Sequence, residues 1–281
     1  LDLASLGAYT DLGDEPPTSG YDHPRAVEYL QGQPDFFRID SRTDVADKWQ
    51  PNLALLAGLY DVNGVDNPLV IADVARFWSG TGGRSTPLYD FMGARYVLGS
   101  KDVALDWNKF SLAFDGDPTV NVYRNETTMP RALVVHQAVV VPSQESAWAR
   151  IQEAGFDPAS KVILEGGQPL DSTGGNGATA QVLNYGSNKL EIVVDTPQAG
   201  YLVLSDPFYP GWRAAVDGQE VELLRANYAF RAVAVSAGTH RVTMNFRPGT
   251  ALVGAGISAL TLLVLLILGI VALVRQRREN S

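Results

Sequence analysis

Three arginines near the C-terminal end of the chain are candidates for binding phosphate: Arg213, Arg225 and Arg231. A guanidinium group carries a rigid fork of N–H donors that matches two oxygens of a phosphate group. The alternative is that each arginine pairs with a carboxylate of the same segment at the protein surface, and we favour this pairing. The carboxylates available for it are Asp206, Asp217 and Glu222.

Aromatic residues are concentrated in the same segment: Phe208, Tyr209, Trp212, Tyr228 and Phe230. Their rings suit stacking against a sugar, or a belt of side chains at a membrane surface. Alternatively they are packing residues, with Pro210-Gly211 setting a turn and Trp212 filling the end of a β-domain. We favour packing, because large aromatic side chains are mostly buried.

The remaining polar candidates are weaker. Arg84 lies in the loop GTGGRSTP, whose backbone amides could join it around a phosphate, but the spacing is not that of a P-loop and a mobile loop is the default. Asp73, Asp90 and Asp206 have no partners in the sequence that would indicate acid–base catalysis. No catalytic residue is therefore predicted from the residues alone.

No metal or cofactor site is expected. The sequence has no cysteine, and its three histidines are scattered. The acidic segment 11–17, DLGDEPP, does not have the spacing of a calcium loop and reads as a solvated loop. The net charge is -9, and the basic residues are dispersed apart from a cluster of arginines at the C-terminus, which argues against a nucleic-acid partner.

An uncharged run from 251 to 274, ALVGAGISALTLLVLLILGIVALV, predicts a transmembrane helix. At 1.5 Å per residue, a run of this length just crosses a hydrocarbon core of roughly 30 Å. Arg275, Arg277 and Arg278 follow it, and short basic flanks stay on the cytoplasmic side. We therefore expect a cytoplasmic C-terminus and an extracytoplasmic location for everything before the helix.

Two different patterns precede the membrane helix. Up to residue 170 the predicted helices (24–30, 52–60, 69–78, 88–92, 143–154) alternate with predicted strands (36–40, 95–99, 110–114, 119–124, 131–141, 161–164). After the Gly-rich segment DSTGGNGA, seven short strands are predicted at 180–184, 189–195, 200–205, 212–216, 220–224, 230–235 and 240–246. Their regular spacing and the hairpin turn Asp217-Gly218 favour an antiparallel β-sandwich.

The prediction for the whole chain is thus an α+β fold. Hydrophobic residues make up 46%, enough for packed cores. The predicted parts are a mixed α/β domain (1–170), a linker (171–179), a β-sandwich (180–248), a transmembrane helix (250–274) and a cytoplasmic tail (275–281).

An ordered set of motifs resembles a known family. In chain order these motifs are Gly93-Ala94-Arg95-Tyr96-Val97-Leu98, Tyr123-Arg124-Asn125, Met129-Pro130-Arg131-Ala132, Tyr209-Pro210-Gly211-Trp212, Asp217-Gly218, Asn227-Tyr228-Ala229-Phe230-Arg231 and Ala237-Gly238-Thr239-His240. Followed by a membrane span, the set resembles the C-terminal end of the bacterial YfhO-like membrane protein family. The resemblance covers roughly residues 90–275.

This resemblance implies a polytopic protein of the bacterial cell membrane, similar to the GT-C class of glycosyltransferases. Such enzymes transfer a sugar from a polyprenyl-phosphate carrier to a cell-envelope glycopolymer, such as lipoteichoic acid. The implied partners are the lipid bilayer, upstream transmembrane helices of the same protein, the lipid-linked sugar and the glycopolymer.

The catalytic acid of that class belongs to the first extracytoplasmic loop, near the N-terminal spans. The chain starts at Leu1 without such a region, so we expect a fragment that is inactive alone, and no catalytic residue is carried over. The alternative, from a different class, is a non-catalytic membrane-tethered module that binds envelope polysaccharide.

Overall fold

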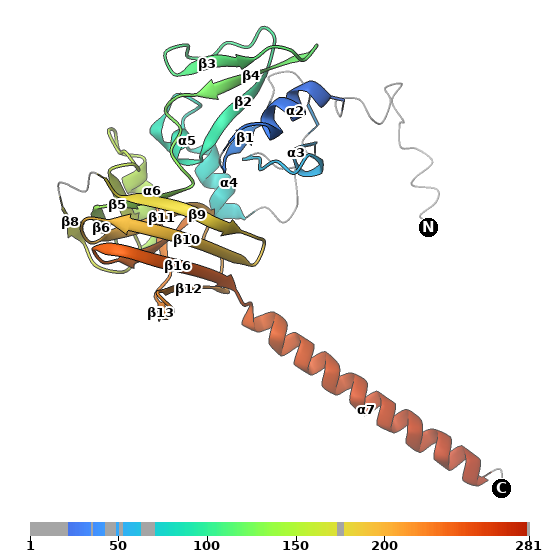
Figure 1. Ribbon diagram of the computed structural model, residues 1–281. Helices are drawn as coiled ribbons and strands as arrows, with labels where there is room; N and C mark the ends of the chain where they lie inside the picture. Colours follow the sequence, from blue (N-terminus) through green and yellow to red (C-terminus); the bar gives the residue numbers. More distant parts are fainter. Residues whose placement is uncertain are drawn as a thin grey trace.

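The computed structural model describes residues 22–34, 36–42, 49–50, 53–62, 71–172 and 177–279. Within these ranges the chain folds into three β-sheets, flanking helices and one long C-terminal helix, α7 (Gly249–Glu279), as Figure 1 shows. The predicted α+β class is confirmed. The predicted acidic loop at 11–17 lies outside the described residues.

The N-terminal unit is a four-stranded sheet in the order β1-β2-β4-β3, with β1 parallel to β2 and the other pairs antiparallel. Its elements are β1 (Arg38–Asp40), β2 (Ala94–Ser100), β3 (Phe110–Phe114), β4 (Val120–Asn125), α2 (Pro24–Gln31) and α3 (Leu53–Leu56). Leu30 of α2 and Leu53 of α3 share one hydrophobic core with Leu98 and Val122 of the sheet. The two short helices therefore cover one face of this sheet.

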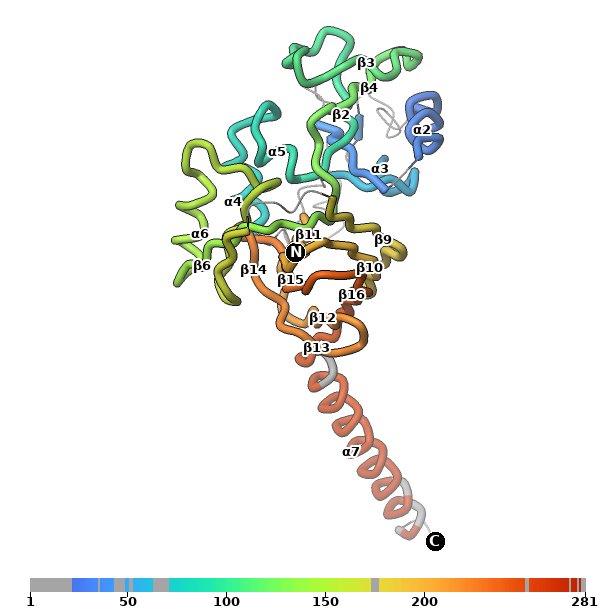
Figure 2. The backbone as a smooth tube through the Cα atoms, turned by 60° about the vertical axis from the view of Figure 1, so that its left-hand side comes forward, coloured from blue at the N-terminus to red at the C-terminus, as the bar shows by residue number. Residues whose placement is uncertain are grey.

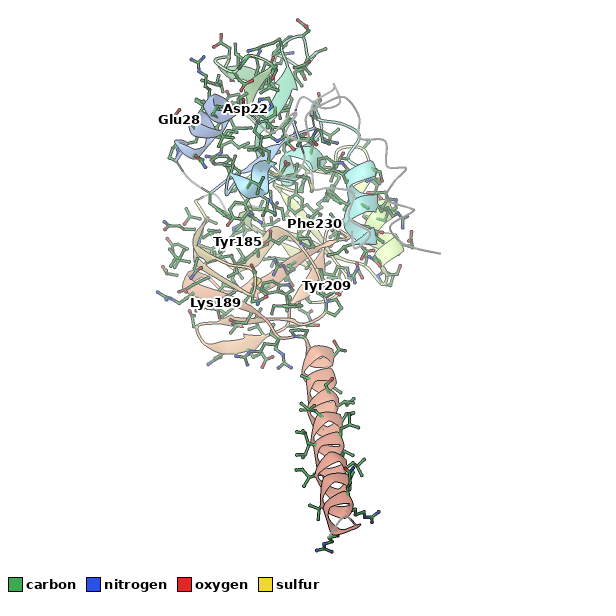
Figure 3. The ribbon with its side chains drawn as sticks, turned by 90° about the vertical axis from the view of Figure 1, so that its right-hand side faces the viewer. Asp22, Glu28, Tyr185, Lys189, Tyr209 and Phe230 are labelled. Carbon is green, nitrogen blue, oxygen red and sulfur yellow. The ribbon has the colours of Figure 1, made fainter. Side chains whose placement is uncertain are left out.

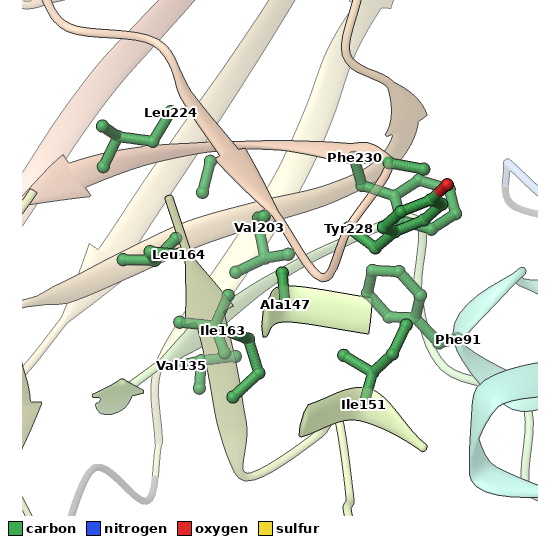
Figure 4. Packing of buried hydrophobic residues seen from close by; sticks show 14 of the residues in the cluster. Phe91, Val135, Ala147, Ile151, Ile163, Leu164, Val203, Leu224, Tyr228 and Phe230 are labelled. Atoms are coloured by element: carbon green, nitrogen blue, oxygen red, sulfur yellow. The ribbon is translucent and has the colours of Figure 1, made fainter. Parts of the chain in front are cut away.

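A seven-stranded sheet forms the centre of the molecule, in the order β5-β11-β15-β14-β7-β6-β8. Its strands are β5 (Ala132–Val135), β6 (Gln137–Val140), β7 (Lys161–Leu164), β8 (Leu170–Asp171), β11 (Gly200–Pro207), β14 (Leu224–Ala226) and β15 (Phe230–Val235). Its outer face packs with α4 (Ala72–Ser79), α5 (Pro87–Phe91) and α6 (Gln144–Ile151). Figure 4 shows this core, in which the rings of Phe91 and Phe230 pack against each other and Ile151 and Val203 belong to the same cluster.

A five-stranded antiparallel sheet covers the other face of the central sheet. Its order is β13-β12-β16-β10-β9, with β9 (Thr179–Tyr185), β10 (Lys189–Thr196), β12 (Trp212–Val216), β13 (Gln219–Val221) and β16 (Gly238–Phe246). Leu202 and Val233 of the central sheet share a core with Ile192 and Val242 of this sheet. The two sheets form a sandwich, because alternate side chains of each strand point into the shared layer.

Strand pairing crosses the predicted linker. Strand β5, before the linker, pairs antiparallel with β11 after it, and β7 pairs with β14. These pairings satisfy backbone N–H and C=O groups that would be unpaired at the edges of a free-standing sandwich. The division into domains stays a prediction, and the sandwich draws its strands from both sides of residues 171–179.

Two predicted strands are interrupted in the structure. The segment 131–141 breaks at His136 into β5 and β6, and these two strands lie at different places in the central sheet. The segment 220–224 divides between the two sheets, since β13 ends at Val221 and β14 begins at Leu224. A single pattern of apolar residues does not reveal where a chain passes from one sheet to the other.

Helix α7 continues directly from β16 and leaves the sandwich at the end where β12 and β13 lie (Figure 2). Residues 253–276 are long and apolar enough to cross a membrane, and none of this segment packs against the rest of the described chain. The Thr261 hydroxyl donates to the carbonyl of Ile257 (2.9 Å), so it is satisfied within the helix. An isolated helix that is apolar on all sides suits burial in lipid.

Candidate functional site

One carboxylate is surrounded by three arginines at the end of the sandwich from which α7 leaves. Asp206 lies at the end of β11 and is fully buried. Its Oδ1 atom accepts hydrogen bonds from Arg38 Nη2 (2.6 Å) and Arg131 Nε (2.9 Å). Arg231 Nη2 lies 3.0 Å from Oδ2 as an ion pair. We call these four residues the Asp206 cluster.

The cluster forms the floor of an open pocket of about 460 Å³, which we call the Asp206 pocket. Its aromatic lining residues are Tyr185, Tyr209, Trp212 and Phe246, and the loop residues Ser187 and Asn188 lie at its edge. Phe246 is the last residue of β16, three positions before α7 begins. Figure 3 shows Tyr185 and Tyr209 on the side of the sandwich that faces the viewer, with Tyr209 near the start of α7.

Arg38 joins the N-terminal unit to the sandwich. It lies in β1, and its Nη1 atom donates to the carbonyls of Met92 (2.9 Å) and Ser205 (3.0 Å) and to the Ser205 hydroxyl (2.8 Å). Together with the Asp206 bond, these contacts fix the guanidinium group in a single orientation. Burial and the neighbouring charge of Arg131 lower the pKa of Arg38 to about 10.

Arg131 precedes β5 and lies among aromatic rings. Its guanidinium carbon is 3.9 Å from the ring centre of Tyr185, 4.7 Å from that of Phe36 and 5.1 Å from that of Tyr60. Its Nη2 atom donates to the Tyr185 hydroxyl. Ring faces attract a guanidinium ion most strongly where water is excluded.

Arg231 and Trp212 face each other on opposite sheets of the sandwich. Arg231 lies in β15 and is 3% exposed, and its guanidinium carbon is 4.2 Å from the ring centre of Trp212 in β12. The Trp212 ring is half-buried and also contacts Phe246, with ring centres 5.5 Å apart. Burial lowers the pKa of Arg231, and the carboxylate of Asp206 opposes this shift.

The turn that carries Trp212 into the pocket requires Gly211. Its φ is 106°, a backbone conformation that favours glycine. A Cβ atom there would lie 3.0 Å from the Phe246 ring and 3.1 Å from Cα of Pro248, so only glycine lets this turn approach the base of α7. The Pro210-Gly211 turn was predicted from the sequence, and its contact with the start of α7 was not.

The Asp206 pocket carries excess positive charge. The charged residues that line the pocket are three arginines and one carboxylate, that of Asp206. Burial alone would raise the pKa of Asp206, but the charges of the three arginines outweigh burial and hold the pKa below its ordinary value. The carboxylate is therefore ionised and the cluster has a net charge of +2.

Two donor atoms of the cluster lack an acceptor within the described part of the chain. Arg131 Nη1 and Arg231 Nε are buried, and neither makes a hydrogen bond. Asp206 Oδ2 likewise accepts no hydrogen bond, although it forms the ion pair with Arg231. Unsatisfied buried N–H groups are uncommon in folded proteins and indicate a missing partner.

The predicted site residues fall into two groups. Tyr209, Trp212 and Arg231 meet in the Asp206 pocket. The others lie elsewhere: Arg213 pairs with Glu220 (3.4 Å), Arg225 pairs with Asp73 (2.6 Å), Tyr228 is buried in the core of the central sheet, and Arg84 pairs with Asp40 (3.0 Å) in the N-terminal unit.

Each predicted arginine thus has a carboxylate partner, and for Arg213 and Arg225 it is not one of those proposed from the sequence. The aromatic group also divides. Tyr228 and Phe230 are core residues, Tyr209 is about half exposed (49%), and Trp212 contributes to both the core and the pocket.

Several pocket residues were missed from the sequence as members of a site, among them Arg38, Arg131, Tyr185 and Phe246. Arg131 stood inside the Met129-Pro130-Arg131-Ala132 motif, and this was the signal that could have identified it. Arg38 and Tyr185 lie in ordinary strand patterns, 168 and 21 positions before Asp206 along the chain. Only the tertiary fold brings them together.

The other carboxylates considered in the sequence are engaged in ion pairs. Asp73 accepts from Arg225, and Asp90 lies 2.7 Å from Lys109 and accepts from Asn125 (2.8 Å). Within the described ranges, no group of three or more His, Asp or Glu side chains is placed to hold a metal ion.

A β-sandwich that continues into an apolar helix of membrane-spanning length defines a membrane protein with a β-rich domain outside the lipid. Comparison with protein families supports this class. The family model described as "Bacterial membrane protein YfhO" matches residues 174–258, which cover β9 to β16 and the start of α7, so this part of the chain is similar to that membrane protein family. Searches of curated proteins and of solved structures returned no match.

Proposed function

We propose that this chain is the extracytoplasmic C-terminal part of a membrane glycosyltransferase. In this proposal the full protein transfers a sugar from a polyprenyl-phosphate carrier to a cell-envelope glycopolymer. The Asp206 pocket holds part of the lipid-linked sugar or of the acceptor. The observation that carries the proposal is the position of this pocket, which opens beside the start of α7 and is walled by aromatic rings.

The aromatic wall suits a sugar. Tyr209 and Phe246 lie with ring centres 6.1 Å apart, and Trp212 is next to Phe246. Aromatic rings offer apolar faces to the C–H groups of a pyranose, while the hydroxyl of Tyr209 and the edge residues Ser187 and Asn188 offer hydrogen bonds. The start of α7 lies at the bilayer surface, so a lipid-anchored ligand has a short path to the pocket.

The pocket supports binding and positioning, with the chemistry located elsewhere in the protein. Asp206 is the carboxylate among the lining residues, and it is held ionised by three arginines. A group so placed does not exchange a proton near neutral pH. The same observation favours the alternative function, a non-catalytic tethered module that binds envelope polysaccharide.

Transfer assays on the membrane-embedded protein that carries this chain test the proposal. The donor is a polyprenyl-phosphate sugar with a radiolabel, and incorporation into envelope polymer is measured. We expect Tyr209→Ala to lower transfer at least tenfold, because the ring is half exposed and forms the pocket wall. Trp107→Ala is the matched control, since Trp107 is an exposed aromatic residue of the N-terminal unit and does not line the pocket (60% exposed).

Equal transfer by the Tyr209→Ala and Trp107→Ala proteins would refute a role of the pocket in transfer. Retention of labelled glycopolymer by the protein, with no incorporation of sugar from any lipid-linked donor, would instead support the tethered binding module.

A further inference from the structure

The unsatisfied donors of the Asp206 cluster indicate a ligand. Arg131 Nη1 and Arg231 Nε are buried and have no hydrogen-bond partner among the described residues, and both side chains line the same pocket. Each arginine is held in place by its other atoms: Arg131 by Asp206 and Tyr185, and Arg231 by Asp206 and the Trp212 ring. A ligand with acceptor atoms in the pocket would satisfy these two fixed N–H donors.

The charge of the pocket specifies the ligand as an anion. The lining residues carry three positive charges and one negative charge, and the carboxylate lies on the floor of the pocket between the arginines. The remaining lining residues are neutral, so they do not compensate the net charge of +2. Bulk water screens this charge poorly, because the three arginine side chains are at least nine-tenths buried. Uncompensated buried charge is costly, so an anion that enters gains strong interactions.

We infer that the Asp206 pocket binds a phosphate ester, with Arg131 and Arg231 donating to its oxygens. A phosphate group matches the residual charge and has several acceptor oxygens, so it can accept from two guanidinium groups at once. The ester substituent then points towards the aromatic wall of Trp212 and Tyr209. This inference rests on the proposed function only for the placement of the pocket at the outer membrane surface.

The phosphate can come from a lipid head group or from a soluble phosphate monoester. The full chain in neutral detergent micelles is titrated calorimetrically with inorganic phosphate and with glycerol 3-phosphate, which are the soluble probes. In the second arm the chain is placed in phosphatidylcholine nanodiscs with or without phosphatidic acid, and the fluorescence of its tryptophans is recorded. Saturable signals in the soluble arm identify a soluble ester, and a signal that needs phosphatidic acid identifies a lipid head group.

Variants at the pocket edge report on the site without disturbing the buried ion pairs. Ser187 is exposed and lines the pocket, so Ser187→Asp adds a negative charge where the anion enters. We expect it to weaken binding roughly tenfold or more, from Coulomb repulsion at short range. Gln181→Glu is the matched control: it adds the same charge at an exposed position of β9 that does not line the pocket, and it should leave binding unchanged.

Arg131→Lys provides a second test inside the cluster. Lysine keeps a positive charge near Asp206 but lacks the forked donors, so phosphate binding should fall while the protein stays folded, as checked by circular dichroism. The absence of phosphate binding in both arms, or equal binding by the Ser187→Asp and Gln181→Glu proteins, would overturn the inference. Phosphate binding without sugar transfer would support this inference and refute the proposed function. Sugar transfer without phosphate binding would support the proposed function and refute this inference.

Discussion

Replacing Asp206 with asparagine should strongly destabilise the fold, although the two side chains have nearly the same shape. Asp206 is 1% exposed, and its carboxylate contacts three buried guanidinium groups, those of Arg38, Arg131 and Arg231. In Asp206→Asn the net charge of the cluster rises from +2 to +3. One acceptor oxygen is also replaced by an NH₂ group that faces other donors.

The expected loss is about 3–5 kcal/mol in the free energy of unfolding, the range measured when one partner of a buried ion pair is removed. This is a large share of the about 5–15 kcal/mol that holds a typical domain folded. The measurement is equilibrium urea unfolding of the full chain in neutral micelles, followed by tryptophan fluorescence. Glu220→Gln is the control, because it removes an exposed carboxylate whose pair with Arg213 lies in water and should cost at most about 0.5 kcal/mol.

The electrostatic cause can be separated from a loss of shape. Arg131→Gln combined with Asp206→Asn returns the cluster to a net charge of +2. The double variant should therefore be more stable than the sum of the two single losses predicts. If Asp206→Asn costs less than about 1 kcal/mol, or if the two losses simply add, the three arginines do not depend on this carboxylate and the reasoning fails.

Three further predictions concern the sandwich and its orientation. Trp212→Ala should cost about 2–3 kcal/mol, somewhat below the range for a fully buried tryptophan because the ring is half-buried, and an unchanged urea midpoint would contradict this. The bond with Asp217 raises the pKa of His240 and lowers that of Asp217, so the pair stabilises the fold below pH 6.5 and above pH 3.8. The stabilisation by this pair is lost when the pH rises through the folded pKa of His240, and it is also lost when the pH falls through the folded pKa of Asp217. The difference in the free energy of unfolding between wild type and His240→Gln should therefore be largest between pH 3.8 and pH 6.5. For topology, we expect an impermeant thiol reagent to label a cysteine at Ser187 in intact cells and not one at Ser281, and the opposite pattern would reverse the proposed sidedness.

Much of the fold could be predicted because its elements carry local signals. The helix α6 lies within the predicted helix 143–154 and begins after Ser143, whose hydroxyl accepts from the Ser146 N–H (3.2 Å) and so caps the helix. The turn between β12 and β13 is the predicted Asp217-Gly218 hairpin, with positive φ at both residues. Signals of this kind depend on a few neighbouring residues, so one sequence is sufficient to read them.

The sharing of one sheet between the two halves of the chain could not be predicted. The strands β5 and β11 read as ordinary half-buried strands, and nothing local states that Val134 lies opposite Leu202. The same limit applied to the site. Arg38 reaches Asp206 across 168 positions of sequence, and no spacing rule connects them.

The motif Asn227-Tyr228-Ala229-Phe230-Arg231 illustrates how a pattern can be visible while its meaning is not. Asn227 has positive φ, and its side chain accepts from the Ile163 N–H (2.9 Å), so it shapes the buried turn between β14 and β15. Phe230 enters the helix-covered core of the central sheet. The following residue, Arg231, points to the opposite face because side chains alternate along a strand. One five-residue motif thus serves a turn, a core and a pocket.

The composition of the Asp206 cluster argues for a functional origin. A buried ion cluster is weak evidence for stability, because well-packed apolar side chains of similar volume are often as stable or more so. An excess of two positive charges makes the contribution of this cluster to the stability of the fold still less favourable. The cluster nevertheless lies between the sheets of the sandwich, where alternate positions of β11 and β15 hold Leu204 and Val233. Residues that cost stability in a core, and that border an open aromatic pocket beside the membrane helix, are best explained by a ligand that supplies the missing negative charge.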